Sequence, residues 1–272
     1  MAIVDRGAPY DFGGATFDLD AEADRRVLRF VLSQALYGEA TGVYCGLSLY
    51  SARSLRAAEF YVRQARQELA HLRLFGEIFR ELDLTPEPGH WVMRLLSTHN
   101  DYYPVKVLLE HAVGEGLVLD VFRDLLLQTL PDDDPRVPSI KKKLRVICRE
   151  EEEHVAWGEA EVRRLLREEP WLRTPFEGLV RLELGVVPLI VRSLRGMAPG
   201  HPVLAHLDGF VERAVAHARA QARELGILPA SEPSPARALG AVAAGLGLYA
   251  RSRVARRRSR LERTYLGELG FE

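Results

Sequence analysis

Two segments of this chain repeat the same spacing of chemically active side chains. Glu68 and His71 are separated by two residues, and so are Glu151 and His154. Each pair lies in a stretch whose apolar residues recur at helical spacing, and residues three apart share one face of a helix. Each segment therefore directs a carboxylate and an imidazole toward the same place, and these are donors that suit a metal ion.

Two further glutamates occupy comparable positions in two other predicted helices. The apolar stripes of these helices are interrupted at Glu39 and at Glu115. A charged residue inside a buried stripe is unfavourable unless it is paired or bound to a metal. Counted from the turns that join the helices, the acids of each hairpin lie within about one helical turn of each other in height. The spacing therefore predicts a single site with four carboxylates and two imidazoles. The candidate ligands are Glu39, Glu68, His71, Glu115, Glu151 and His154.

Two other groups of residues are also considered as candidate metal ligands. Glu110 is a second acid in the third helix, but it lies off the apolar stripe on the row of Lys106, so we favour Glu115. Glu87 and His90 repeat the Glu-x-x-His spacing in a segment rich in Pro and Gly. Such a segment offers no helix face, so this third copy predicts no site.

The candidate ligands lie on four predicted helices, whose ends are indicated by Pro- and Gly-rich segments and by breaks in the apolar period. These helices span about residues 21–51, 55–82, 103–130 and 139–167. Two helical hairpins joined by one long connection are typical of a four-helix bundle with a single crossover. Further helical patterns follow at about residues 176–194, 202–225 and 236–266.

These patterns predict an all-α protein in three parts. Residues 1–20 form an irregular N-terminal arm, residues 21–167 form the four-helix bundle with the two-metal site, and residues 168–272 form a helical extension packed on the bundle. The chain has 272 residues, of which 47% are hydrophobic, so it can bury a sizeable core.

The net charge and the number of cysteines limit the classes of protein to which this chain can belong. The net charge of −1 argues against a nucleic-acid-binding protein, although the arginine run Arg251–Arg260 leaves such a partner open. Cys45 and Cys148 are too few and too distant for a disulfide framework, which favours a reducing compartment. The sequence has no secretory signal and no apolar run of membrane-spanning length, so we expect a cytoplasmic location.

The predicted ligand set favours a pair of metal ions. Carboxylates can bridge two metals, imidazole suits iron, and four negative charges balance two divalent cations. We expect two iron ions, with a manganese–iron or two-manganese site also compatible, and O2 as the co-substrate. The chain has no Gly-x-Gly-x-x-Gly motif after a strand, no phosphate loop and no Cys-x-x-Cys motif. Electrons are therefore expected from an external donor, such as a reductase or a ferredoxin.

Two segments also resemble a known group of proteins. They are Val113-Gly-Glu-Gly-Leu-Val-Leu-Asp-Val-Phe122 and Glu151-Glu-Glu-His-Val-Ala-Trp-Gly-Glu159. Together they look like the second half of a ferritin-like di-iron oxygenase, in which a lone Glu precedes a Glu-x-x-His segment. The resemblance covers about residues 25–167 and extends to aldehyde-deformylating oxygenases, ribonucleotide-reductase small-subunit-like oxidases, tRNA hydroxylases and phenylacetyl-CoA epoxidases. It implies a ferritin-like bundle with the six metal ligands named above and O2 as co-substrate. The additional C-terminal helices predicted within residues 168–272 have no counterpart in this resemblance.

The first functional hypothesis is a non-heme di-iron monooxygenase or oxidase. Its substrate would be a small-molecule or carrier-bound organic compound, and hydroxylation, desaturation, N-oxygenation and C–C cleavage all fit the site. A second hypothesis is a ferroxidase, another iron-handling protein or a peroxide-scavenging di-metal protein. A third is a tRNA-modifying hydroxylase, supported by the arginine run alone. A homodimer is compatible with each of these hypotheses.

Overall fold

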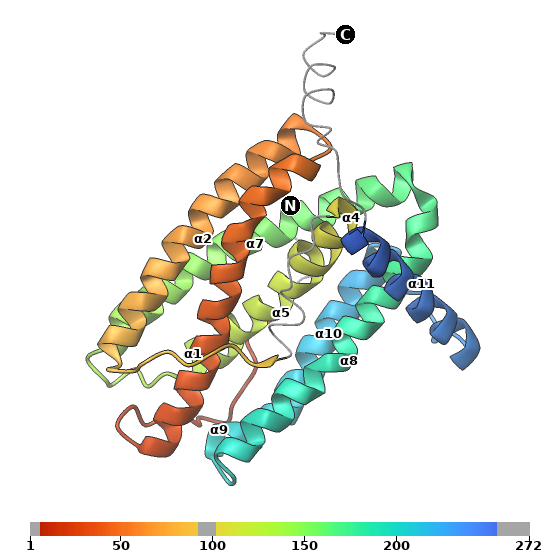
Figure 1. The fold of residues 1–272 in the computed structure, drawn as a ribbon. Helices are drawn as coiled ribbons and strands as arrows, with labels where there is room; N and C mark the ends of the chain where they lie inside the picture. Colours follow the sequence, from red (N-terminus) through yellow and green to blue (C-terminus); the bar gives the residue numbers. More distant parts are fainter. Residues whose placement is uncertain (1–5, 92–101, 255–272) are drawn as a thin grey trace.

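The structure is a computed structural model that describes residues 6–91 and 102–254. Within these ranges the regular secondary structure is helical, and no strand is present there. The all-α fold class predicted from the sequence is therefore confirmed. Figure 1 shows the long helices α1, α2 and α7 side by side with the helix that contains α5. None of the described helices combines the length and the apolar character needed to cross a membrane.

Three helices of the bundle begin within two residues of the predicted positions. They are α1 (Glu22–Gly42), α2 (Leu55–Glu81) and α7 (Val137–Glu168). The Ser54 side chain accepts a hydrogen bond of 3.1 Å from Ala57 N and caps the start of α2. Pro138 lies in the first turn of α7, where its missing N–H is tolerated. The first helix is shorter than predicted, because Val43–Ser51 forms the 3₁₀ helix η1 instead.

The third helix of the bundle is continuous but alternates between α and π geometry. Its segments are α4 (Tyr103–Lys106), η2 (Val107–Gly114), α5 (Glu115–Asp120), η3 (Val121–Leu126) and α6 (Leu127–Thr129). At the end of the π segment η2, the Glu115 N–H donates to the carbonyl oxygen of Glu110, five residues earlier. The sequence predicted one regular helix, so the π segments are a departure from that prediction. Such segments are frequent at functional sites.

Further helices follow the bundle. They are η4 (Pro170–Leu172), α8 (Arg173–Met197), α9 (Pro202–Ala205), α10 (Leu207–Glu224) and α11 (Pro235–Val254). The helix α8 contacts α1 and η2, α10 contacts α5 and α8, and α11 packs on α8 (Figure 1). The predicted helix 202–225 is divided at His206. The arginine run Arg251–Arg260 lies outside the side chains that the structure describes, and the division of the chain into three parts stays a prediction.

The apolar core consists of two clusters with a gap between them. One cluster includes Phe75 of α2 and Cys148 of α7, and the other includes Tyr61 of α2 and Val162 of α7. Between Tyr61 and Phe75, and between Cys148 and Val162, neither cluster has a buried member. This layer of the bundle contains the two predicted Glu-x-x-His segments.

Candidate metal centre

The layer between the two apolar clusters brings all six predicted ligands together. Their donor atoms form two groups, and within each group all the atoms lie within 4.8 Å of one another. Glu68 belongs to both groups. Five of the six residues are buried, and the side chain of Glu115 is 11% exposed. The first group contains Glu39, Glu68, His71 and Glu151, and the second contains Glu68, Glu115 and His154.

The two histidines direct the same ring nitrogen into this layer. The Nδ1 atom of His71 lies 2.9 Å from Glu39 Oε2 and 3.2 Å from Glu151 Oε1. The Nδ1 atom of His154 lies 3.3 Å from Glu151 Oε2. Glu68 also places one oxygen near each histidine, at 3.9 Å from His71 Nδ1 and 3.8 Å from His154 Nδ1. Glu68 and Glu151 therefore lie where carboxylates could bridge two metal ions.

Each histidine is oriented by a partner on the outer side of its ring. The Nε2 atom of His71 lies 2.8 Å from Glu150 Oε2, and that of His154 lies 2.9 Å from Gln67 Oε1. Both partner oxygens accept hydrogen bonds, so each Nε2 carries a proton. An outer acceptor of this kind fixes the tautomer that leaves the inner nitrogen available to a metal. The sequence analysis selected neither Gln67 nor Glu150 as a ligand, although each directly precedes a predicted ligand.

The site contains more negative charge than its two histidines can compensate. Burial raises the pKa of Glu68 and of Glu115 well above the ordinary value, and neighbouring carboxylates add to the effect. Burial alone would raise the pKa of Glu151, but hydrogen bonds from His154 and His71 outweigh it and lower the pKa to about 2. Burial would lower the pKa of His71, but Glu151 and Glu39 raise it to about 10.

These pKa shifts fit a site that could hold cations. Without metal ions, protons on the acids and on His71 reduce the repulsion between the carboxylates. Two divalent cations would balance the four carboxylates and remove that need. The donor set is oxygen-rich with one imidazole in each group, so it fits two ions such as iron or manganese.

Two buried polar residues beside the acids were missed by the sequence analysis. The Gln64 Nε2 atom donates to Glu68 Oε1 at 3.1 Å and to Glu115 Oε1 at 2.8 Å. The Nδ1 atom of His111 lies 3.1 Å from Glu115 Oε1, and its Nε2 atom has no hydrogen-bond partner among the described residues. Gln64 precedes Glu68 by four residues and His111 precedes Glu115 by four, so helical spacing could have identified both.

The alternative acid Glu110 lies close to the site because of the π geometry of η2. Residues five apart do not share a face of a regular α-helix, but they do approach each other across a π turn. Donor atoms of Glu110, His111 and Glu115 lie within 4.8 Å of one another. Glu110 forms an ion pair with the buried Lys106, which reduces its availability to a metal. Our preference for Glu115 as the ligand stays a prediction.

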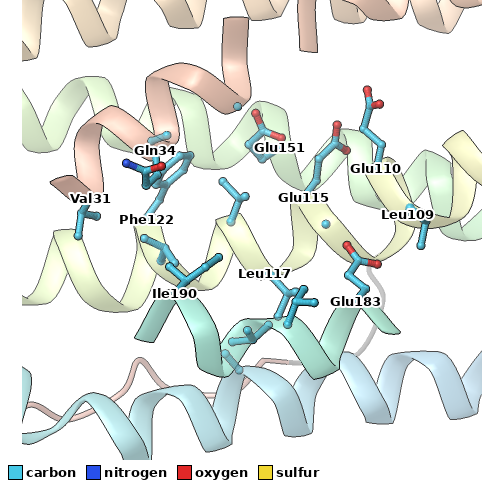
Figure 2. A pocket seen from close by; sticks show the side chains of 18 of the residues that line it. Val31, Gln34, Leu109, Glu110, Glu115, Leu117, Phe122, Glu151, Glu183 and Ile190 are labelled. Atoms are coloured by element: carbon cyan, nitrogen blue, oxygen red, sulfur yellow. The ribbon is translucent and has the colours of Figure 1, made fainter. Parts of the chain in front are cut away.

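An apolar cavity of about 340 Å³ extends from the carboxylate layer. All four predicted glutamate ligands line it, and its walls are side chains of α1, the third helix, α8 and α10. Figure 2 shows Glu115 and Glu151 in one part of the cavity and Val31, Phe122 and Ile190 farther along it. The acids that could hold metal ions therefore face a space large enough for a small organic ligand.

Comparison with known proteins supports the fold. The chain resembles a solved structure described as protein 19 with aldehyde deformylating oxidase activity from Synechococcus, with a TM-score of 0.55 and 16% sequence identity. The alignment covers 78% of this chain and 99% of that one. No protein-family model and no curated protein matches the chain. At this identity the likeness shows the fold alone, and the chain has the ferritin-like bundle fold that its sequence predicted.

Proposed function

We propose that this chain is a di-metal oxidoreductase that uses O2 to oxidise an organic substrate, with iron as its preferred metal. The observation that carries the proposal is the convergence of the six donor residues at one part of an apolar cavity. Buried acids are unfavourable without compensation, so their concentration in the core requires a function such as metal binding.

The residues of the chain have separate roles in this proposal. Glu39, Glu68, Glu115 and Glu151 supply the carboxylates, and the two histidines each supply Nδ1. Glu150 and Gln67 hold protons on the outer nitrogens of the histidines. When bound, the metal pair supplies the O2 chemistry that amino-acid side chains do not provide. Electrons come from an external donor such as a reductase or a ferredoxin.

The cavity favours an organic substrate over an iron-handling role. An iron-handling or peroxide-scavenging protein needs no ligand-sized apolar space beside its metals. Here the apolar walls would bind the body of a substrate by removing its surface from water. The aldehyde deformylating oxidase activity of the similar solved structure makes aldehydes one compound class to test. Hydroxylation, desaturation, N-oxygenation and C–C cleavage remain the proposed reaction types.

Metal loading tests the proposal directly. After anaerobic incubation with Fe(II) and removal of loose metal, the chain should retain about two ions. Glu68→Ala and Glu151→Ala should lose this metal and the O2 consumption that depends on added aldehydes, amines or alcohols. Glu87→Gln is a matched control, because Glu87 belongs to a Glu-x-x-His segment in a loop and pairs with Arg29.

Other outcomes would contradict the proposal. A folded chain that retains no metal would reject the site. Retention of far more iron than two ions per chain would favour an iron-handling protein. O2 consumption stimulated by tRNA and by none of the small compounds would favour the tRNA hydroxylase.

A further inference from the structure

A buried acid outside the metal-binding set lines the same cavity. Glu183 lies on α8, its exposed fraction is 8%, and its Oε2 atom has no hydrogen-bond partner among the described residues. Its side chain extends from α8 toward the third helix (Figure 2). A Cβ atom placed on Gly114, next to Glu115 in the chain, would lie 3.4 Å from Glu183 Oε1. Glu183 therefore reaches the cavity close to the metal-binding layer.

The other polar side chains around this cavity have partners within the chain. Gln34 Nε2 donates to the Phe30 carbonyl oxygen at 3.1 Å, and Gln34 Oε1 accepts from the His90 N–H at 2.6 Å. The Thr41 hydroxyl donates to the Gly38 carbonyl oxygen at 2.8 Å. These groups are satisfied without a ligand.

Among the described acids that line the cavity, Glu110 and Glu115 also have a buried oxygen without a hydrogen-bond partner. Glu110 pairs with Lys106, however, and Glu115 belongs to the predicted metal ligands, whereas Glu183 forms no ion pair with any described residue.

The charges near Glu183 indicate which kind of ligand the cavity would bind there. Lys106 and Glu110 also line the cavity, and they pair with each other. Two metal ions would balance the charge of the four predicted glutamate ligands, and Lys106 balances Glu110. Among the described residues, Glu183 is therefore an acid with no counter-charge at this part of the cavity. Ionised Glu183 would repel a carboxylate ligand, whereas a cationic group would stabilise the charged form of Glu183. Burial raises the pKa of Glu183 well above its ordinary value, as expected for an acid without a counter-charge.

We infer that Glu183 binds the amino group of an amine substrate whose apolar body fills the cavity. The inference deepens the proposed function and rests on it for the role of the cavity as the substrate site. The ammonium group would donate hydrogen bonds to Glu183 and supply the missing counter-charge. The apolar body would lie against side chains of α8 and α10, such as Ile190 and Phe210. Bound in this way, the amine end of the substrate lies beside the metal centre.

Binding of length-matched ligands tests this inference without requiring turnover. Dissociation constants for octylamine, 1-octanol and octanoate can be measured by calorimetry on the metal-loaded chain. Octylamine should bind at least about 10-fold more tightly than 1-octanol, because hydrogen bonds between charged groups are the strong ones. Octanoate should bind most weakly. Glu183→Gln should remove the preference for the amine and leave 1-octanol binding within about 2-fold.

Two further variants keep the test decisive. Glu183→Leu removes the polar group altogether, and it should fold and also lose the preference for the amine. Glu177→Gln is the matched control, because Glu177 is a buried acid of the same helix that pairs with Arg181. This control should retain the full preference. Equal binding of amine and alcohol by the unaltered chain, or an unchanged preference in Glu183→Gln, would overturn the inference.

The two proposals fail in different ways. Normal metal content without a preference for the amine would overturn the role of Glu183 alone. A chain without metal that still prefers octylamine, and loses this preference in Glu183→Gln, would overturn the oxidoreductase proposal and retain the amine site.

Discussion

The hydrogen bond between His71 Nε2 and Glu150 determines which nitrogen of His71 faces the centre. An acceptor on the outer nitrogen of a metal-binding histidine fixes the tautomer and raises the basicity of the inner nitrogen. Glu150 performs this role from the residue next to Glu151, so α7 supplies both a predicted ligand and the partner of another ligand.

Removal of the Glu150 carboxylate should weaken metal binding without unfolding the chain. In Glu150→Ala, the dissociation constant for Fe(II) should rise about 10-fold, within the range typical of such partners. Competition with a chromogenic chelator under anaerobic conditions measures this change. Glu153→Ala is the control, because Glu153 is exposed on the same helix. Equal metal affinity in the two variants would show that Glu150 does not support the site.

The position of the Glu68 carboxylate depends on one glycine of α1. A Cβ atom placed on Gly42, at the end of α1, would lie 2.7 Å from the carboxylate carbon of Glu68. Such a contact is too short, and Glu68 is the acid shared by both donor groups. The end of α1 therefore has to be a glycine if Glu68 is to keep its position.

The Gly42→Ala variant tests this requirement. The added methyl group should displace the Glu68 carboxylate, and the metal content after Fe(II) loading should fall below half of the normal value. Gly38→Ala is the matched control, because a Cβ atom there would have no neighbour within 4 Å. This control should keep its metal and gain up to about 1 kcal/mol of stability from helix propensity. Full metal loading of Gly42→Ala would contradict the argument.

The sequence predicts helix positions well where they follow from apolar periodicity, and poorly where they depend on packing between helices. Apolar periodicity and Pro-rich breaks predicted both ends of α2 and α7 to within a few residues, because amphipathic helices must bury one face. They placed the end of the first helix about nine residues too late, because Val43–Ser51 continues the helical pattern as the 3₁₀ helix η1. The π segment η2 was not predictable in this way, because its residues have ordinary helical patterning and packing decides its geometry. Glu183 could have been noticed as an acid in an apolar helix. Its place in the cavity depends on how α8 packs on α1 and η2, which periodicity does not determine.

At the scale of the whole molecule, the metal-free chain should lose stability as the pH rises from about 7 to 9. The pKa of folded His71 is raised from 6.5 to about 10, so folded His71 holds a proton that the unfolded chain has released. Glu68 and Glu115, whose pKa values are also raised, act in the same direction. The folded state binds more protons than the unfolded state in this range, so the free energy of unfolding falls with pH.

Urea unfolding at several pH values measures this dependence. The metal-loaded chain is the control, because bound cations replace the protons and the free energy of unfolding should then change much less with pH. A metal-free chain that is equally stable at both ends of this range would contradict the proton assignment.

The π segment η2 also affects how the sequence of this chain should be aligned with those of related proteins. A π segment contains one residue more than an α-helix of the same rise and leaves the two ends in place. A relative with a regular helix here would need a one-residue gap between Val107 and Gly114 to match this chain on both sides. An ungapped alignment would shift either Lys106 or Glu115 out of register. At 16% identity, an ungapped comparison of sequence positions would therefore place Glu115 one residue away from its counterpart, whereas superposition of the helices would not.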